Sequence, residues 1–126
     1  MIEIYEIQVQ AEFSAAHAIQ GYPGDCARTH GHNWTIEVYV KCTKLNEIGI
    51  AIDFRDIKQA LNGIIKDFDH RHLNELPIFK SINPTSENIA RHFYRELSSR
   101  INSDGVKVSK VKASESQKTG VFYWEE

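Results

Sequence analysis

Residues 34–42, Trp34-Thr-Ile-Glu-Val-Tyr-Val-Lys-Cys42, alternate apolar and polar side chains without interruption. Successive side chains of a strand point to opposite faces of a sheet, so the alternation predicts a strand with one buried face. Residues 3–13, Glu3-Ile-Tyr-Glu-Ile-Gln-Val-Gln-Ala-Glu-Phe13, show the same period. The two segments together predict an antiparallel hairpin joined by a long loop.

In the middle of the chain the apolar residues change to a helical period. Asp53 precedes the first helical stripe, and its carboxylate can accept hydrogen bonds from the free amides of the first turn. Thr85 is the expected N-cap of a second helix, whose dipole favours Glu87 in the first turn. The stripes are Phe54, Ile57, Leu61, Ile64 and Phe68, and then Ile89, Phe93, Leu97 and Ile101. Two amphipathic helices are therefore expected.

Two later segments are rich in β-branched and aromatic residues. They cover residues 106–113 and 121–124, and the polar turn 116–119 separates them, so they predict a closing hairpin. The order is then ββααββ in a single domain over residues 1–126. Because strands and helices do not alternate, we expect an α+β fold with an antiparallel four-stranded sheet and both helices on one face.

The composition narrows the class of protein. A formal net charge of -2 offers no broad basic field, so nucleic acid is not an expected partner. The first residues alternate charged and apolar side chains, unlike a signal peptide or membrane span, so a cytoplasmic location without membrane association is expected. A reducing compartment would keep both cysteines as thiols, and Cys42 is assigned to the core.

Three histidines are candidate metal ligands. His30 and His32 are two residues apart, so on an extended segment both point to the same side. His17 keeps the apolar parity of the first strand, which would bring a third imidazole to the same end of the sheet. Three neutral nitrogen ligands suit zinc and leave the fourth position open, as in catalytic zinc sites. Solvated loop histidines are the alternative from spacing alone, and His72 and His92 are assigned to the surface.

Three further segments carry groups suited to proton transfer or to binding. Cys26 lies in the loop before His30, where its thiol could reach a metal or a substrate, or could be a small buried side chain. Asp69 beside His70 could orient the imidazole in a turn, or the two could be solvated at a helix end. Glu115 could accept two parallel hydrogen bonds from a ring that carries an amino group next to a ring N–H, or be a solvated residue beside a hairpin turn.

A series of short motifs runs along the chain: Phe13-Ser-Ala-Ala-His17, Cys26-x-x-x-His30-Gly-His32, Ile52-Asp-Phe54, Asp69-His70, Leu73-Asn74, Pro84-Thr-Ser-Glu-Asn88 and Glu115-Ser. In their order and spacing these motifs resemble the 6-pyruvoyl-tetrahydropterin synthase family over nearly the whole chain. The resemblance implies the tunnelling fold, in which ββααββ protomers close trimeric barrels that pair into hexamers, with active sites between subunits. Closure of a barrel would also remove exposed sheet edges.

The same resemblance implies a role for each candidate residue. Three imidazoles would bind a zinc ion: those of His17, His30 and His32. Cys26 and the pair of Asp69 and His70 would transfer protons. Glu115 would hold the ring of a pterin substrate.

The spacing inside the second motif indicates a branch of the family. Three residues separate Cys26 from His30, which resembles the bacterial 6-carboxytetrahydropterin synthases of queuosine and deazapurine synthesis. That branch implies conversion of 7,8-dihydroneopterin triphosphate to 6-carboxytetrahydropterin with loss of acetaldehyde and triphosphate, which is carbon–carbon lyase chemistry. The alternatives are pyruvoyl formation, cleavage to 6-hydroxymethyl-dihydropterin, and a noncatalytic zinc-stabilised binding module with Cys26 as a fourth metal ligand.

Overall fold

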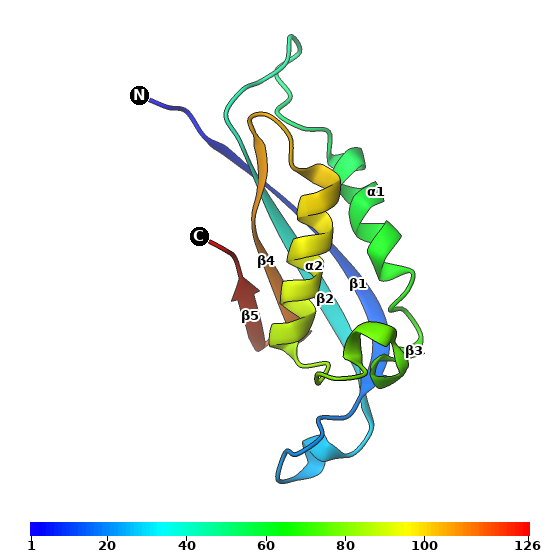
Figure 1. The fold of residues 1–126 in the computed structure, drawn as a ribbon. Coiled ribbons are helices and arrows are strands. Elements are labelled where there is room, and N and C mark those ends of the chain that lie inside the picture. Colours follow the sequence, from blue (N-terminus) through cyan, green and yellow to red (C-terminus); the bar gives the residue numbers. More distant parts are fainter.

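A computed structural model describes all 126 residues and shows a five-stranded sheet with two helices across one face (Figure 1). The strands lie side by side in the order β3-β1-β2-β4-β5. Their bounds are β1 Tyr5–His17, β2 His30–Cys42, β3 Arg71–His72, β4 Val106–Ser116 and β5 Thr119–Tyr123. The helices are α1 Phe54–Ile65 and α2 Ser86–Ile101. The expected α+β class and the two-helix layer are therefore confirmed.

The sheet contains one strand more than the four expected. The two residues of β3 pair in parallel with β1 at Ala15 and Ala16, whereas all other neighbouring strands are antiparallel. A turn after α1 causes this pairing, because the amide of His70 donates a hydrogen bond of 2.6 Å to the carbonyl of Ser14 and brings the chain beside β1. A strand of two residues is too short to leave a period in the sequence.

The central hairpin β1–β2 extends beyond the alternating segments. Its register pairs Phe13 with Trp34 and His17 with His30. Phe13 and Trp34 are buried, and their rings stack with centroids 6.1 Å apart. Because side chains two and four residues apart share a face, the imidazoles at the end of the hairpin lie on the face that the helices cover.

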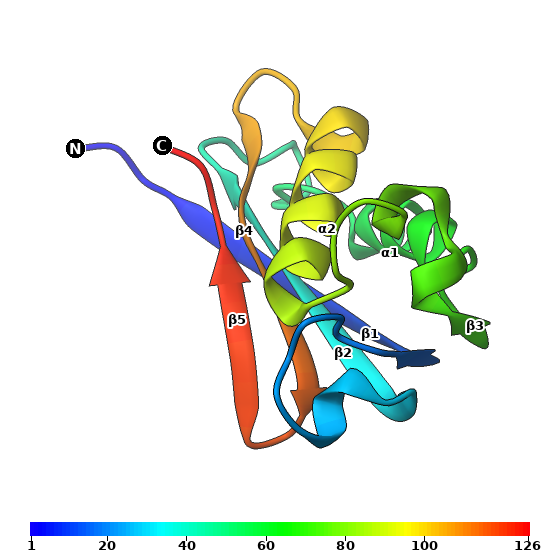
Figure 2. The ribbon, with the colours of Figure 1, turned by 60° about the horizontal axis from the view of Figure 1, so that its bottom comes forward.

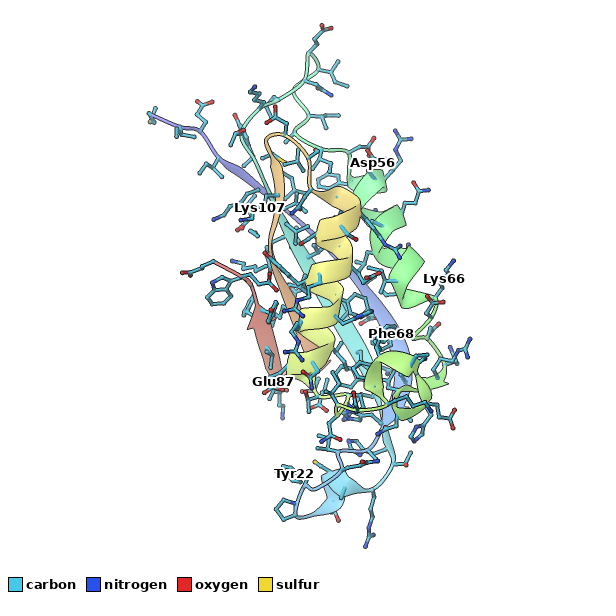
Figure 3. The ribbon with its side chains drawn as sticks, in the orientation of Figure 1. Tyr22, Asp56, Lys66, Phe68, Glu87 and Lys107 are labelled. Atoms are coloured by element: carbon cyan, nitrogen blue, oxygen red, sulfur yellow. The ribbon has the colours of Figure 1, made fainter.

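Both helices begin at the residues that the sequence indicated. Asp53 accepts a hydrogen bond from the amide of Arg55 at 2.8 Å, and Thr85 accepts one from the amide of Asn88 at 3.1 Å. Phe68 lies past the end of α1, yet it points into the core and is 2% exposed (Figure 3). Neither helix is long and apolar enough to cross a membrane. The N-caps were therefore correctly predicted, and so were the core stripes except at Phe54, which begins α1 and is 58% exposed.

The surface positions expected for two histidines need correction. His92 on α2 is half-buried, because its ring stacks on Phe68 with centroids 5.6 Å apart, and this burial lowers its pKa. His72 is also half-buried in β3, and its Nε2 lies 3.2 Å from the hydroxyl of Thr29. Cys42, in contrast, is fully buried as expected.

Two asparagine side chains hold the chain where it leaves β1. Asn74 accepts a hydrogen bond from the amide of Ala18 and donates one to its carbonyl, both at 2.9 Å. Asn83 makes the same pair of bonds with Gln20, at 3.0 and 2.9 Å. Each carboxamide thus takes the place of a neighbouring peptide group. The loop of residues 18–29, which projects from the end of the sheet, is therefore fixed where it starts (Figure 2).

Candidate metal centre and neighbouring groups

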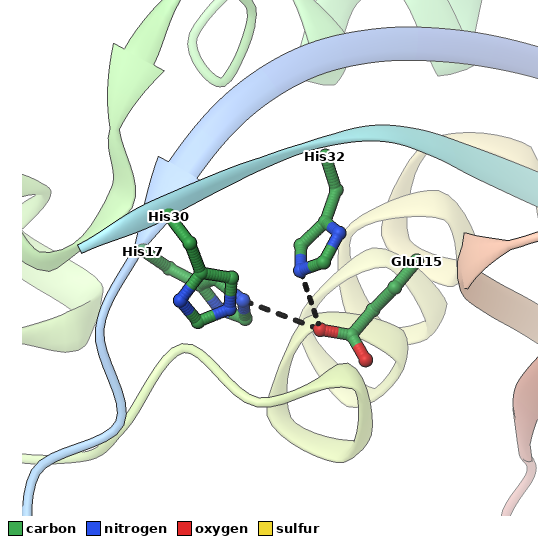
Figure 4. Close-up of side chains that lie close together, drawn as sticks. All are labelled: His17, His30, His32 and Glu115. Carbon is green, nitrogen blue, oxygen red and sulfur yellow. Dashed lines mark ion pairs between the residues drawn. The ribbon is translucent and has the colours of Figure 1, made fainter. Parts of the chain in front are cut away.

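Three imidazoles meet at the end of the β1–β2 hairpin. His17 is the last residue of β1, and His30 and His32 are the first and third residues of β2. The ring centroids of His17 and His30 are 4.6 Å apart, and those of His17 and His32 are 5.2 Å apart. The single chain thus brings the three histidines together at one end of the sheet, on its covered face (Figure 4).

The fourth member of the group comes from β4. Oε2 of Glu115 lies 3.2 Å from Nε2 of His17 and 3.0 Å from Nε2 of His32 (Figure 4). The donor atoms of the three histidines and Glu115 all lie within 4.8 Å of one another. We call these four residues the four-donor group.

The contact between Glu115 and the histidines was not predicted from the sequence. The sequence analysis assigned the Glu115 carboxylate only to hydrogen bonds with the ring of a ligand. A signal was nevertheless present, because Glu115 follows Val111 and Ala113 at intervals of two residues, and both are fully buried. Their common parity places the Glu115 side chain on the covered face of the sheet.

Backbone carbonyls fix the tautomers of two histidines. Nδ1 of His17 lies 2.7 Å from the carbonyl oxygen of Pro84, and Nδ1 of His30 lies 2.7 Å from that of Arg28. A carbonyl can only accept, so Nδ1 carries the hydrogen in both rings and Nε2 keeps its lone pair. This second partner on the far side of the ring is typical of imidazoles that bind a metal.

Two ring nitrogens face one carboxylate oxygen of Glu115. Nε2 of His17 and Nε2 of His32 are buried and make no hydrogen bond, although the carboxylate oxygen is within 3.2 Å of each. The distances permit a hydrogen bond, but a ring nitrogen that keeps its lone pair and a carboxylate oxygen are both acceptors, so neither can donate to the other. Buried nitrogens that face a carboxylate without bonding to it need a third group between them, and a cation would satisfy all of them. The four-donor group therefore fits a metal ion.

The environment of His17 favours its neutral form. Its burial is the largest influence and lowers its pKa, while the hydrogen bond to Pro84 opposes this and the nearby His30 lowers the pKa further. A neutral imidazole is the form that binds a metal. Nitrogen and carboxylate oxygen donors of this kind suit zinc and other divalent transition metals.

Cys26 lies outside the four-donor group. It belongs to the 3-10 turn Asp25–Ala27, and its carbonyl accepts a hydrogen bond of 2.9 Å from the amide of Ile19. The thiol is half-buried, and it is not among the atoms that converge with the histidines. The fourth position of the group is held by a carboxylate oxygen, which argues against a closed site with Cys26 as the fourth ligand.

Asp69 and His70 form a turn that is bonded to β1. Oδ1 of Asp69 accepts a hydrogen bond from the amide of Ser14 at 2.9 Å and lies 3.0 Å from Nδ1 of His70. His70 has a φ of 60°, a left-handed conformation that is uncommon for residues other than glycine. The Ser14 amide is the largest influence that lowers the pKa of Asp69, and the His70 ring adds to it. The pair thus has the turn geometry that the sequence required for an oriented imidazole.

The ring of His70 is largely exposed beside an open hollow of about 540 Å³. Most of its lining on β1 and β2 alternates with the residues of the covered face, namely Ser14, Ala16, Gly31 and Asn33, and the lining also includes Ala15 and His32. Within one chain, the Asp69–His70 turn therefore faces the uncovered side of the sheet. It does not join the four-donor group.

The sequence profile of the 6-pyruvoyl tetrahydropterin synthase family matches residues 6–126. A putative 6-carboxy-5,6,7,8-tetrahydropterin synthase of Archaeoglobus fulgidus is 37% identical over 111 residues, which cover 88% of each chain. A dihydroneopterin monophosphate aldolase of Pyrococcus furiosus is 33% identical over 114 residues, which cover 89% of this chain and 90% of the relative. The solved structure of Caenorhabditis elegans 6-pyruvoyl tetrahydropterin synthase is 24% identical and shares the fold, with a TM-score of 0.86 over 99% of this chain and 98% of that one.

Proposed function

The chain belongs to the 6-pyruvoyl tetrahydropterin synthase family, and from this membership we propose that it is a zinc-dependent 6-carboxytetrahydropterin synthase. Its reaction would convert 7,8-dihydroneopterin triphosphate and one molecule of water to 6-carboxytetrahydropterin, with release of acetaldehyde and triphosphate, as a step of queuosine or deazapurine synthesis. The relative from Archaeoglobus fulgidus that bears the name of this activity supports the choice within the family. The observation that carries the proposal is the four-donor group, which pairs three imidazoles with one carboxylate.

The metal and the ring of the substrate use different parts of the site. Three Nε2 atoms would hold zinc: those of His17, His30 and His32. Bound zinc would polarise the hydroxyl oxygens of the substrate side chain and stabilise the negative charge that develops as protons leave. The carboxylate of Glu115 would accept two hydrogen bonds from the amino edge of the pterin ring.

Two further groups would move protons. We assign Cys26 as the base that removes a proton from the substrate side chain. His70 would exchange the complementary proton through Nε2, because Asp69 holds its Nδ1 at 3.0 Å and leaves the other nitrogen exposed. Two groups with different surroundings can in this way divide the acid and base roles.

The proposal includes an oligomer with sites between subunits. Within one chain the Asp69–His70 turn faces the uncovered side of the sheet, whereas the four-donor group lies on the covered side. A complete site then requires the His70 of one protomer near the metal of another. A trimer or hexamer of this chain is therefore part of the proposed mechanism.

A second product within the family has a specific observation in its favour. The relative from Pyrococcus furiosus is a dihydroneopterin monophosphate aldolase and matches this chain over a similar length. Cleavage to 6-hydroxymethyl-dihydropterin would use the same metal and the same ring contact. The number of phosphates on the preferred substrate separates the two reactions.

The proposed function is tested by product analysis. Purified, zinc-loaded protein is incubated in parallel with 7,8-dihydroneopterin triphosphate and with the monophosphate, and the products are identified by mass spectrometry after trapping of acetaldehyde. We expect 6-carboxytetrahydropterin and acetaldehyde from the triphosphate. A hydroxymethyl pterin from the monophosphate would replace the synthase with the aldolase, and a pyruvoyl pterin would replace it with the pyruvoyl-forming enzyme. Absence of turnover by the folded, metal-loaded protein would favour a noncatalytic binding module.

A further inference from the structure

We propose that His72 is a positioning residue and that it acts through the hydroxyl of Thr29. The contact between them fixes the far end of the loop of residues 18–29, which carries Cys26. The role of Cys26 in catalysis rests on the proposed function, whereas the position of the loop does not, so the two can fail separately. The observation behind the proposal is a single side-chain hydrogen bond between residues 43 positions apart in the chain.

One short segment holds both ends of the loop of residues 18–29. At its start, the carboxamide of Asn74 makes two hydrogen bonds of 2.9 Å with the backbone of Ala18. At its far end, the hydroxyl of Thr29 lies 3.2 Å from Nε2 of His72, which is a hydrogen-bond distance. The two side chains that reach the loop are therefore only two residues apart in the chain.

The segment that holds the loop is anchored in the core. Leu73, which lies between His72 and Asn74, is fully buried. The backbone of His72 also pairs with Ala16 of β1. Thr29, in contrast, is exposed and precedes the first residue of β2. Because the histidine side is the anchored one, the contact places the loop and not the histidine.

Few other contacts fix the far part of the loop. None of residues 18–29 is fully buried. Past Gln20, two hydrogen bonds join the loop to the rest of the protein, namely the contact of Thr29 and the bond from the ring of His30 to the carbonyl of Arg28. A segment with so few buried contacts opens locally at a low cost in free energy. Loss of the Thr29 contact should therefore release one end of the loop.

The same end of the loop orients a proposed metal ligand. Nδ1 of His30 donates to the carbonyl of Arg28 at 2.7 Å, and Thr29 lies between these two residues in the chain. A shift of Thr29 would displace that carbonyl. His72 thus helps to place both the thiol of Cys26 and one imidazole of the four-donor group, although it is not a member of that group.

The ring of His72 makes this one polar contact and no other. Its Nδ1 is buried and has no hydrogen-bond partner, so Nε2 is the only ring nitrogen that has one. The hydroxyl of Thr29 can donate or accept, so the bond forms with either tautomer of the neutral ring. A substitution of His72 therefore tests a single hydrogen bond.

The position of the loop is tested by the rate at which iodoacetamide labels Cys26 in the purified protein without substrate. Cys42 is fully buried, so its labelling reports global unfolding and verifies that each variant is folded. His72→Phe keeps a ring without the polar atom, and Thr29→Val removes only the hydroxyl. We expect each to raise the Cys26 rate about two- to tenfold, the change in local opening that corresponds to one hydrogen bond. His72→Gln, which keeps a polar group of similar reach, should stay close to wild type.

The double variant of Thr29→Val with His72→Phe decides whether the two residues act through the same bond. We expect its labelling rate to equal that of either single variant, because one contact can be lost only once. Thr43→Val is the control, since Thr43 is an exposed threonine just past the other end of β2 and its hydroxyl makes no hydrogen bond. Unchanged labelling in the single variants, or effects that multiply in the double variant, would overturn the proposal.

Turnover of the pterin substrate connects the loop to the proposed function. We expect His72→Phe to lower kcat about tenfold with KM and zinc content retained, because a displaced thiol is poorly aligned with the substrate. His72→Gln should restore kcat. Faster labelling of Cys26 with unchanged kcat would refute the role in catalysis. If labelling changes as expected while wild-type protein turns over no pterin, the positioning of the loop stands and the proposed function fails.

Discussion

A single carboxylate oxygen organises the turn at Asp69. It accepts the amide hydrogen of Ser14 and faces Nδ1 of His70, so it joins a strand to an imidazole. These contacts lower the pKa of Asp69 in the folded protein, with the Ser14 amide as the largest cause. A carboxyl whose folded pKa is depressed stabilises the fold above its ordinary pKa of about 3.9, and this contribution is lost as the pH falls through the folded pKa.

We expect Asp69→Asn to be less stable than wild type at neutral pH, because the uncharged amide accepts the Ser14 hydrogen more weakly. The difference in the free energy of unfolding should shrink as the pH is lowered from about 5 to about 3, where the wild-type carboxylate also becomes protonated. Urea unfolding at each pH measures it. Asp67→Asn is the control, since Asp67 is exposed and makes no side-chain hydrogen bond. A difference that is independent of pH would contradict the role of the charge.

The two cysteines allow chemistry to be separated from packing. We expect Cys26→Ala to lower turnover of the pterin substrate by about 100- to 10,000-fold, the range for loss of a general acid or base. Zinc content and the unfolding midpoint should remain, because Cys26 is outside the four-donor group. Cys42→Ala should lower the free energy of unfolding by about 1 kcal/mol, because it leaves a small cavity in the core. Turnover of the pterin substrate should be retained in this variant. Loss of zinc in Cys26→Ala would instead identify the thiol as a ligand.

Single-residue predictions from sequence succeeded where strand parity was sufficient. The parity of β1 and β2 already placed His17, His30 and His32 on one side, because the hairpin makes them neighbours. Glu115 could not be placed beside them in the same way, since its position depends on β4 pairing with β2. That pairing joins segments that are far apart in the chain, and no local pattern encodes it.

At the scale of elements, asparagine side chains, and not a neighbouring strand, bind the backbone of the residues that follow β1. The carboxamides of Asn74 and Asn83 each make two hydrogen bonds to the backbone of residues 18–20. They lie on either side of the residues Pro77–Phe79, which form a 3-10 turn. The loop that carries Cys26 begins at this clamp, so its position relative to His17 depends on both asparagines.

We expect Asn74→Ala to destabilise the protein by about 1–3 kcal/mol, because two part-buried backbone groups lose their partners, and Asn83→Ala to destabilise it less, because its two bonds to Gln20 are exposed to water. The loop should also open locally, and trypsin should cleave faster after the exposed Arg28. Urea unfolding and timed proteolysis measure the two effects. Asn62→Ala on the exposed side of α1 is the matched control. It should leave the cleavage rate unchanged and the free energy of unfolding unchanged or slightly higher, because alanine has the higher helix propensity. An unchanged cleavage rate in the clamp variants would refute the role of the clamp.

The main elements could be predicted because each has a strong local signal. The alternation of residues 34–42 and the caps Asp53 and Thr85 identified strands and helices correctly. The alternation ended the first strand too early, at Phe13 and not His17, and began the second too late, at Trp34 and not His30, because Gly31 and the histidines interrupt the apolar pattern. β3 was missed because its pairing results from the Asp69–His70 turn and not from its own residues.

At the scale of the whole molecule, the single chain leaves backbone and apolar groups uncovered. β1 pairs with β3 only at Ala15 and Ala16, so most of its outer edge is unpaired, and so is the outer edge of β5. Several apolar side chains near residues 45–54 are also exposed, with Ile48 at 79% and Phe54 at 58%. Long free edges and clustered apolar groups of this kind are usually covered by another chain.

We expect the protein to form a homo-oligomer, with pairing of β1 and β5 edges between protomers. Light scattering after size-exclusion chromatography measures the mass. The double substitution Ile50→Glu and Phe54→Glu should shift it towards smaller species, since charges on the apolar surface oppose association. Ile78→Glu, at a similarly exposed apolar residue elsewhere, should not. A wild-type protein that remains monomeric at micromolar concentration would contradict the proposed sites between subunits.

The strand order also sets a sequence of events during synthesis of the chain. The β1–β2 hairpin carries all three imidazoles and is complete when the first third of the chain has been made. β4 follows both helices in the chain, so it can take its place beside β2 only after they have been synthesised, and Glu115 arrives with it. Contacts between distant segments form slowly, so docking of β4 is expected to be the slow step of folding. A metal ion present at that stage would meet the histidines before the carboxylate, and could serve as a template on which the last strand docks.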